Sequence, residues 1–281
     1  MKILQTISEM KEFVQFEKSR QRTIGFVPTM GYLHDGHLSL IKRSKEENDI
    51  TVLSIFLNPT QFAPNEDLSK YPRDFEKDSR LALESGVDAL FYPKAEELYP
   101  NNYQTYINVE ALSRHLCGKS RPDHFRGVAT IVSKLFNIVS ADHAYFGQKD
   151  AQQYFIIDRM AKDLNFDVNV VMCPIVREKD GLAMSSRNVY LDLQERQQAL
   201  CLYRSLGKAE EAITAGERNA QKIKAIIKEL IDQNPLATID YIETVRTETL
   251  EPVDEIKGPT LIALAIKFGK TRLLDNTIVR I

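Results

Sequence analysis

The chain has 281 residues, 43% of them hydrophobic and 27% charged, which is enough apolar material for a large core or two domains and gives no indication of disorder. Its net charge of −2 provides no overall attraction for nucleic acid or for an acidic membrane, so we expect neither as a partner. No apolar stretch approaches the length of a membrane-spanning helix and the N-terminal residues turn polar early, so we expect a cytoplasmic protein.

In the first part of the chain, short apolar runs alternate with helical patterns. The expected strands are 23–27, 50–56, 89–92, 144–146 and 168–173, and the expected helices are 38–47, 74–85, 128–139 and 152–163. Such alternation predicts an α/β fold, in which a Rossmann-like parallel sheet is covered by helices, over residues 1–175. Ligands of such sheets bind at the carboxyl ends of the strands.

Beyond about residue 175 the pattern changes. Two amphipathic helices are expected at 194–215 and 217–232, followed by alternating strands at 238–246, 261–268 and 272–279. This pattern predicts a smaller α+β domain, residues 176–281, that closes over the active site. The polar segment Arg177–Asn188 between the two regions is expected to act as a hinge and to line the cleft.

The most informative segment, Pro28–His37, joins the first of these strands to its helix. Free amides and aligned peptide dipoles at a helix start favour an anion, while Gly31 and Gly36 permit tight turning and a close ligand approach. His34 and His37 are three residues apart, so both rings can reach the helix start and donate to phosphate oxygens. The segment therefore predicts a phosphate site, and the alternative on spacing alone is an accidental pair on a solvated turn.

This His-x-Gly-His sequence resembles the nucleotide-binding motif of the superfamily that contains nucleotidyltransferases and class I aminoacyl-tRNA synthetases. Further motifs follow in order, and together they resemble the pantothenate synthetases, or pantoate–β-alanine ligases, over nearly the full chain. These motifs are Asn58–Phe62, Tyr71–Arg73, His124–Val128, Phe146–Gln153 and Asp180–Asn188. The short superfamily motif is moderately specific, whereas the ordered set is highly specific.

The resemblance implies an ATP-dependent ligase that condenses (R)-pantoate with β-alanine to pantothenate, in coenzyme A biosynthesis. The pantoate carboxylate would attack ATP to give pantoyl adenylate and pyrophosphate, and the β-alanine amine would then displace AMP. The resemblance also implies a homodimer and Mg²⁺, which phosphates and water would hold with at most one protein carboxylate, Asp78. The alternative for the charged helical face at 74–78 is that it is only solvated.

Four residues would carry the catalysis: His34, His37, Lys149 and Arg187. The histidines would steady the α-phosphate, and Lys149 and Arg187 would hold the outer phosphates. The full ATP-binding set that the resemblance implies is Met30, Gly31, His34, Gly36, His37, Gly147, Gln148, Lys149, Asp150, Val176, Met184, Ser185, Ser186 and Arg187. Without the resemblance, Lys149 and Asp150 would be interpreted as a solvated pair capping the next helix, and 185–187 as a loop.

For pantoate the implied set is Gln61, Gln153, Met30 and Asn58, with Gln61 also assigned to β-alanine. The two glutamines would supply amides, Met30 and Phe62 an apolar wall, and Asn58 a contact to substrate or to the histidines.

The flanking loops have their own assignments. Phe62–Lys70 is the expected lid. Arg121 and His124 would approach the pyrophosphate or the β-alanine end of the site. Asp123 stands where the family usually has glycine, which puts that loop's anion contact in doubt.

Two other functions share some of these features. A nucleotidyltransferase that attaches AMP or CMP to a phosphorylated acceptor would use the same first motif and fold, but the two glutamines suit a metabolite better than a phosphate ester. A nucleotide-sensing or tRNA-binding module would lack a catalytic role, but the chain has no long basic stripe.

Overall fold

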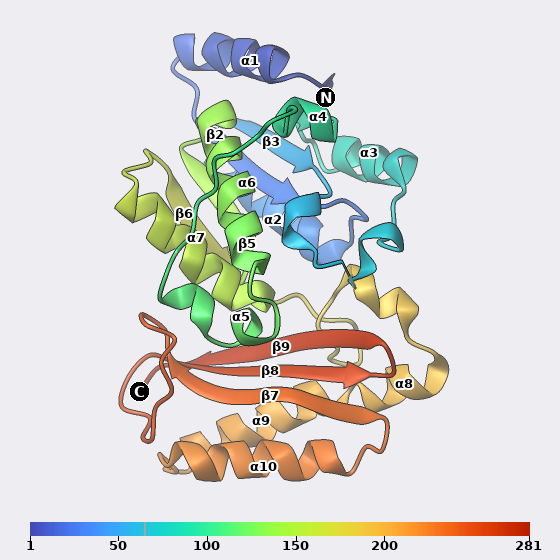
Figure 1. The fold of residues 1–281 in the computed structure, drawn as a ribbon, viewed down its shortest axis with the longest axis vertical. Coiled ribbons are helices and arrows are strands. Elements are labelled where there is room, and N and C mark those ends of the chain that lie inside the picture. The colour runs from blue at the N-terminus through green and yellow to red at the C-terminus, as the bar shows by residue number, and fades with distance from the viewer. Residues whose placement is uncertain (65) are drawn as a thin grey trace.

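A computed structural model of the chain describes residues 1–64 and 66–281, and it contains two separate sheets (Figure 1). The larger is all-parallel, in the order β1-β4-β3-β2-β5-β6, and the smaller is antiparallel, in the order β7-β8-β9. The parallel strands are β1 (Lys2–Leu4), β2 (Ile24–Thr29), β3 (Ile50–Ile55), β4 (Ala89–Phe91), β5 (His143–Gly147) and β6 (Asn169–Cys173). The antiparallel strands are β7 (Ala237–Arg246), β8 (Thr260–Phe268) and β9 (Thr271–Val279).

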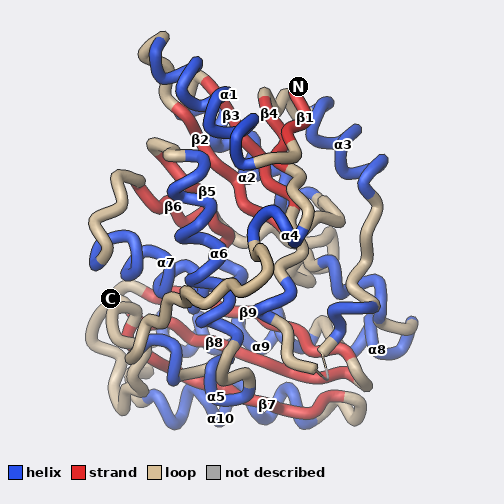
Figure 2. Tube along the Cα trace, turned by 45° about the horizontal axis from the view of Figure 1, so that its top comes forward, coloured by secondary structure: helices blue, strands red, loops and turns tan. Residues whose placement is uncertain are grey.

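The predicted α/β class, with a smaller α+β part after the parallel sheet, is confirmed. Figure 2 shows the same two groups of strands from another direction, with helices around each group. The two sheets fall on either side of residue 175, and the division into domains at that residue stays a prediction. Among the described residues, no helix is both long and apolar enough to cross a membrane.

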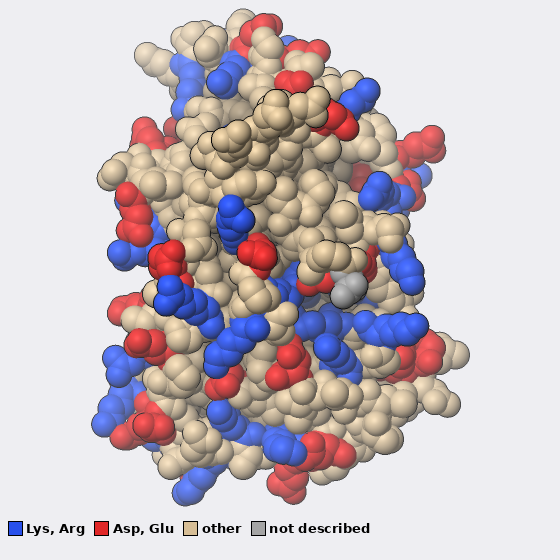
Figure 3. Space-filling model, viewed as in Figure 1, with Lys and Arg blue, Asp and Glu red and all other residues tan. Residues whose placement is uncertain are grey.

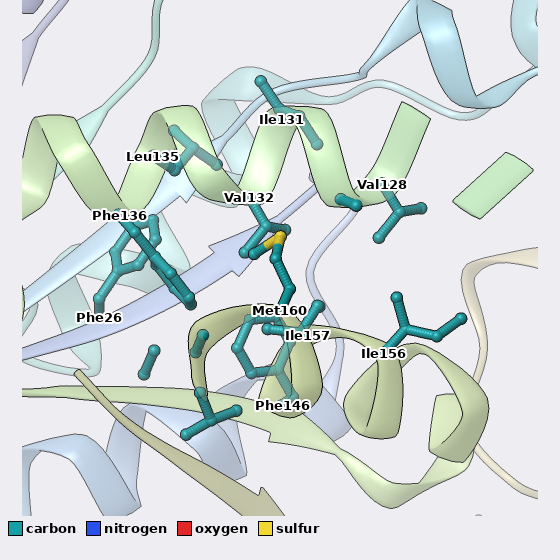
Figure 4. Close-up of a cluster of buried hydrophobic side chains, with 14 of the residues drawn as sticks. Phe26, Val128, Ile131, Val132, Leu135, Phe136, Phe146, Ile156, Ile157 and Met160 are labelled. Atoms are coloured by element: carbon teal, nitrogen blue, oxygen red, sulfur yellow. The ribbon is translucent and has the colours of Figure 1, made fainter. Parts of the chain in front are cut away.

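Helices cover both faces of the parallel sheet. Adjacent strand residues therefore face different cores: Phe26 and Phe146 pack on one face (Figure 4), whereas Val27 and Tyr145 pack on the other. The first face is covered by α1 (Ile7–Ser19), α6 (His124–Val139) and α7 (Ala151–Asp163), and the second by α2 (Asp35–Glu47) and α3 (Phe75–Glu84). Burial on both faces is the reason that these strands are continuously apolar in sequence.

The helix expected over 194–215 is divided in two. The chain forms α8 (Leu193–Gln198) and α9 (Cys201–Thr214), and the Leu202 amide donates to the Ala199 carbonyl across the junction. This i to i+3 bond tightens one turn and interrupts the regular helical bonding. The helix α10 (Ala220–Asp232) follows, and α9 and α10 pack with the antiparallel sheet in one apolar cluster.

Other element boundaries also differ from expectation. The helix expected from residue 128 begins at His124, and the helix expected from residue 74 begins at Phe75 with Asp74 as its cap. The short elements β1, α4 (Ala95–Leu98) and α5 (Cys117–Ser120) were not expected, and neither was α1. A capping box between Thr6 and Glu9 marks the start of α1 and is visible in the sequence.

The turn after β2 is held by the carboxylate of Asp78. Gly31 has a φ of 86° and Tyr32 a φ of 53°. Positive φ is easy for glycine but unfavourable for a residue with a side chain, so the turn is strained at Tyr32. The Tyr32 and Leu33 amides each donate to Asp78, at 2.7 Å, and Asp78 is only 2% exposed. The Asp78 oxygens therefore bind backbone amides, which gives no support to a metal contact, and Asp78 is buried although Asp74 and Glu76 of the same charged face are exposed.

We expect Asp78→Ala to lower the free energy of unfolding by about 2 to 4 kcal/mol, because it leaves two buried amides without an acceptor. Urea denaturation measures this change. Glu76→Ala is the matched control on the same helix, since Glu76 is exposed and its loss should change stability by no more than about 0.5 kcal/mol. Equal stabilities for the two variants would contradict the role given to Asp78.

Candidate active site

A single cleft of about 1250 Å³ brings most of the predicted site residues together. It is lined by the carboxyl ends of β2 and β5, by the segment after β6 and by the β8–β9 hairpin. Gly31 and Gln148 are the predicted ATP residues that do not line it. The predicted residues that do are Met30, His34, Gly36, His37, Asn58, Gln61, Gly147, Lys149, Asp150, Gln153, Val176, Met184, Ser185, Ser186 and Arg187.

The strand order explains why the cleft lies here. The chain leaves β2 toward β3 and leaves β5 toward β6, which are on opposite sides of the β2–β5 pair. The connections after β2 and β5 therefore diverge, and a crevice opens between them at the carboxyl ends of the strands. His34 and His37 follow β2, and Lys149 follows β5, so the topology places all three on this crevice.

The two histidines meet at the start of α2. Their ring centroids are 4.0 Å apart, and His37 Nδ1 lies 3.4 Å from the His34 amide, which donates to it. Gly36 lies within the helix, and a side chain there would come within 2.9 Å of the His34 ring. Gly36 therefore provides space for His34, whereas the sequence suggested that it provides a turn.

Both imidazoles are held in the neutral form. Burial, followed by the positive charge of Lys149, lowers the pKa of His34 to about 4. Burial and the neighbouring His34 lower the pKa of His37 well below its usual value. At neutral pH the rings are therefore uncharged hydrogen-bond donors, and Lys149 supplies the positive charge beside them.

Lys149 and Asp150 form a turn that ends at the cleft. Their side chains are 3.7 Å apart, and the Lys149 side chain is 20% exposed. Asp150 occupies the cap position of α7 but its side chain makes no capping hydrogen bond. The alternative interpretation, a solvated pair whose carboxylate caps the helix, is therefore not what the structure contains.

Arg187 is paired with a carboxylate of the expected lid. Its guanidinium makes a bidentate contact with Asp67, at 2.9 and 3.0 Å, and lies 5.7 Å from the centre of the Tyr71 ring. The Tyr71 hydroxyl is 2.9 Å from Ser186 Oγ. Asn65, which belongs to the same expected lid, lies outside the described residues.

Arg121 has a similar partner. Its side chain binds both oxygens of Glu66, at 2.5 Å each, and donates to the Gln61 carbonyl at 3.3 Å. His124 Nδ1 is 2.9 Å from the same carbonyl. Arg126 is exposed and stacks 4.0 Å from the centre of the Tyr106 ring, and it does not line the cleft.

The amide of Gln61 is held in one orientation. Asn58 Nδ2 donates to Gln61 Oε1 at 3.1 Å, which turns Gln61 Nε2 toward the Met30 sulfur, 2.9 Å away. Asn58 is itself fixed by the Tyr99 hydroxyl, which donates to its Oδ1 at 2.9 Å, and it is 1% exposed. Asn58 therefore orients Gln61, and because it also lines the cleft, its direct contact with substrate stays a prediction.

Two adjacent glutamines on α7 have different environments. Gln152 is buried and binds the backbone of Cys117, Leu112 and His115, so it is a structural residue. Gln153 makes no such contacts in the described chain and is only half-buried, and both glutamines line the cleft.

Several residues that shape the site were not predicted from the sequence. Glu66 and Asp67 lie in the expected lid, but their pairing with cleft arginines was not predicted. Tyr99, which holds Asn58, and two residues of β9 that line the cleft, Asp275 and Asn276, were not named at all. The β9 pair carries a signal in the sequence: two adjacent polar residues in an alternating strand cannot both face solvent.

The comparisons with known proteins cover the whole chain. The family profile described as pantoate-beta-alanine ligase matches residues 2–278. The chain belongs to the pantoate–β-alanine ligase family. The family reaction joins pantoate to β-alanine at the expense of ATP, so the predicted class of enzyme, an ATP-dependent ligase, is confirmed.

Individual relatives agree with this family. The chain is 58% identical to a pantothenate synthetase of Acetivibrio thermocellus over 281 residues, which is 100% of both chains, and 59% identical to that of Pelotomaculum thermopropionicum over 279 residues, 99% of each. The crystal structure of pantothenate synthetase from Thermus thermophilus matches with a TM-score of 0.94 and 43% identity over 99% of both chains. A Francisella tularensis pantoate–β-alanine ligase, solved with β-γ ATP and β-alanine, matches with a TM-score of 0.79 and 34% identity, covering 99% of this chain and 97% of that one.

We expect an NMR titration of His34 to have its midpoint near pH 4, assigned with a His34→Asn variant. Because an unfolded histidine titrates near 6.5, the unfolded chain binds more protons than the folded chain between these values. Stability should therefore fall as the pH is lowered from about 6.5 toward 4, and less steeply in His34→Asn. A midpoint of about 6 or above for His34 in the folded protein would contradict its neutral state.

Proposed function

We propose that this cleft forms pantothenate in two steps through pantoyl adenylate. The pantoate carboxylate attacks the α-phosphorus of ATP and pyrophosphate leaves, and the β-alanine amine then attacks the acyl carbon and AMP leaves. The observation that carries the proposal is the convergence in one cleft of the His34–His37 pair, Lys149 and the Gln61 amide. The relative from Francisella tularensis, which holds β-γ ATP and β-alanine, supports the choice of substrates.

On the phosphate side, two kinds of donor act together. His34 and His37, uncharged at the start of α2, donate hydrogen bonds to the α-phosphate oxygens as negative charge develops on them. Lys149 and the segment Ser185–Arg187 hold the outer phosphates and stabilise the departing pyrophosphate. The positive end of the α2 dipole lies at the same point and adds to this stabilisation.

On the acid side, Gln61 and Gln153 hold pantoate for the attack. The orientation of Gln61, fixed by Asn58, presents its Nε2 donor next to Met30. That donor would meet the hydroxyl or carboxylate oxygens of pantoate, and the Met30 side chain would meet its methyl groups. Gln61 also contacts β-alanine in the second step.

Arg187 requires an exchange of partners. A phosphate presents the same two acceptor oxygens to a guanidinium as the Asp67 carboxylate does. We propose that the ATP phosphates take the place of Asp67 on Arg187. The segment that contains Asp67 would then be free to rearrange over the bound nucleotide and exclude water from the reactive adenylate.

Mg²⁺ enters as part of the substrate in this proposal. Within residues 1–64 and 66–281, no three His, Cys, Asp or Glu side chains are grouped as metal ligands. The Asp78 carboxylate is occupied by two amides. The protein's donor set therefore does not fit a resident ion, and the phosphates of MgATP would hold the metal.

We also propose, from the family resemblance, that the enzyme is a homodimer and works in the cytoplasm, where ATP is available. Light scattering on the purified protein measures the assembly directly.

We expect purified protein with MgATP to produce AMP, pyrophosphate and pantothenate in equal amounts only when pantoate and β-alanine are both present. Mass spectrometry identifies the product, and each acid alone serves as a control. Release of pyrophosphate with a phosphorylated acceptor instead of pantoate would favour the nucleotidyltransferase. Absence of turnover in folded protein would contradict both functions.

We expect His37→Ala to lower pantoate-dependent exchange of pyrophosphate into ATP by about 100-fold to 1000-fold, because a donor to the developing charge is lost. Circular dichroism should show an unchanged fold. His115→Ala is the matched control, since His115 does not line the cleft. Normal exchange in His37→Ala would remove this residue from the reaction.

We expect Gln61→Ala and Gln153→Ala each to raise the KM for pantoate about tenfold, because each loses one hydrogen bond to the acid. The KM for ATP, measured in the same variants, should stay within about twofold of the wild-type value. A selective rise in the KM for ATP would assign these amides to the nucleotide.

A further inference from the structure

The smaller sheet makes direct hydrogen bonds to the turn that carries Lys149. Asn276 of β9 is 4% exposed, and its Nδ2 donates to the carbonyls of Gln148 and Lys149, at 2.9 and 3.0 Å. Gln148 Nε2 returns a contact to Asn276 Oδ1 at 3.3 Å. One amide side chain thus fixes two successive carbonyls at the start of the turn that points Lys149 into the cleft.

The preceding residue of β9 holds the other phosphate-binding segment. Asp275 is 1% exposed and forms a bidentate pair with Arg177, at 2.7 and 2.9 Å. Arg177 also donates to the Gly181 carbonyl at 3.1 Å, and the Met184 amide donates to the Val176 carbonyl at 3.0 Å. These bonds close a hairpin whose end runs directly into Ser185–Arg187.

The two β9 residues are also joined to each other. The backbone amide of Asn276 donates to Asp275 Oδ1 at 2.8 Å. The same carboxylate oxygen therefore accepts hydrogen bonds from Arg177 and from the Asn276 backbone. A shift of β9 would therefore move both phosphate-binding segments together. Figure 1 shows β9 as the strand of its sheet that lies nearest to the parallel sheet, which is the position this contact requires.

We propose that Asp275 and Asn276 are positioning residues for ATP, and that β9 sets the distance between Lys149 and the Ser185–Arg187 segment. The proposal rests on the phosphate-binding role proposed above for those two segments. In this proposal the smaller sheet helps to build the nucleotide site, in addition to any closure of the smaller domain over that site. Buried donors to backbone carbonyls suit this purpose, because they restrict the conformation of a turn.

The test uses the full-length enzyme with Asn276→Asp, which keeps the shape of the side chain but replaces the donor with an oxygen that faces two carbonyls. We expect the KM for ATP in pantoate-dependent pyrophosphate exchange to rise about tenfold, with the KM for pantoate within about twofold of wild type. Hydrogen exchange at residues 148–151 should become faster. Asn276→Ala removes the donor without adding a charge and gives the same readouts if Asn276→Asp does not fold.

Ile227→Ala is the matched control for loss of stability in the same part of the chain. Ile227 is fully buried on α10 and does not line the cleft, so its loss should lower the melting temperature while leaving both KM values unchanged. An unchanged KM for ATP in the Asn276 variants, or an equal rise of both KM values, would overturn the proposal. Absence of exchange in the wild-type enzyme would instead count against the proposed function, while hydrogen exchange at 148–151 would still report on the Asn276 contact.

Discussion

Parallel pairing of β2 with β5 brings the two chemically active turns of this protein to one edge of the sheet. The His34–His37 turn leaves one strand and the Lys149 turn leaves the other, and the connections then diverge because the neighbouring strands lie on opposite sides. Every other part of the site is arranged around this crevice. Asp78 fixes the first turn from α3, and Asn276 fixes the second from β9.

The charge in the cleft comes from individual side chains that line it and not from the chain as a whole, whose net charge is only −2. The arginines that face it are paired with carboxylates: Arg121 with Glu66, Arg187 with Asp67 and Arg272 with Asp240. Figure 3 shows Lys and Arg gathered across the middle of one face, at the height where the two sheets meet, with Asp and Glu among them. Such pairing keeps partly buried guanidinium groups compensated, and it makes anion binding an exchange of partners instead of a simple attraction.

The buried histidines complement these cations. Because His34 and His37 are neutral, they add hydrogen-bond donors to a phosphate without adding charge that the surrounding protein would have to compensate. The neutral state depends on burial beside Lys149, and therefore on the same crevice. The protonation state of the histidine pair therefore depends on the charge of Lys149, although these residues lie far apart in the chain.

The sequence by itself determined the fold class and the family, because buried parallel strands are continuously apolar and because the ordered motifs are specific. Most of the site residues that it predicted line the cleft. It could not determine the roles of Asp78, Asn58 and Asn276. Asp78 and Asn276 bind backbone atoms far away in the chain, which any residue could supply, and Asn58 is held in place by the distant Tyr99. The division between α8 and α9 was hidden because apolar spacing continues through it. Only tertiary structure decides that Gln152, the neighbour of the predicted Gln153, is buried and bound to backbone groups of another segment, because neighbouring positions on a helix differ in direction and the direction has meaning only once α7 is packed.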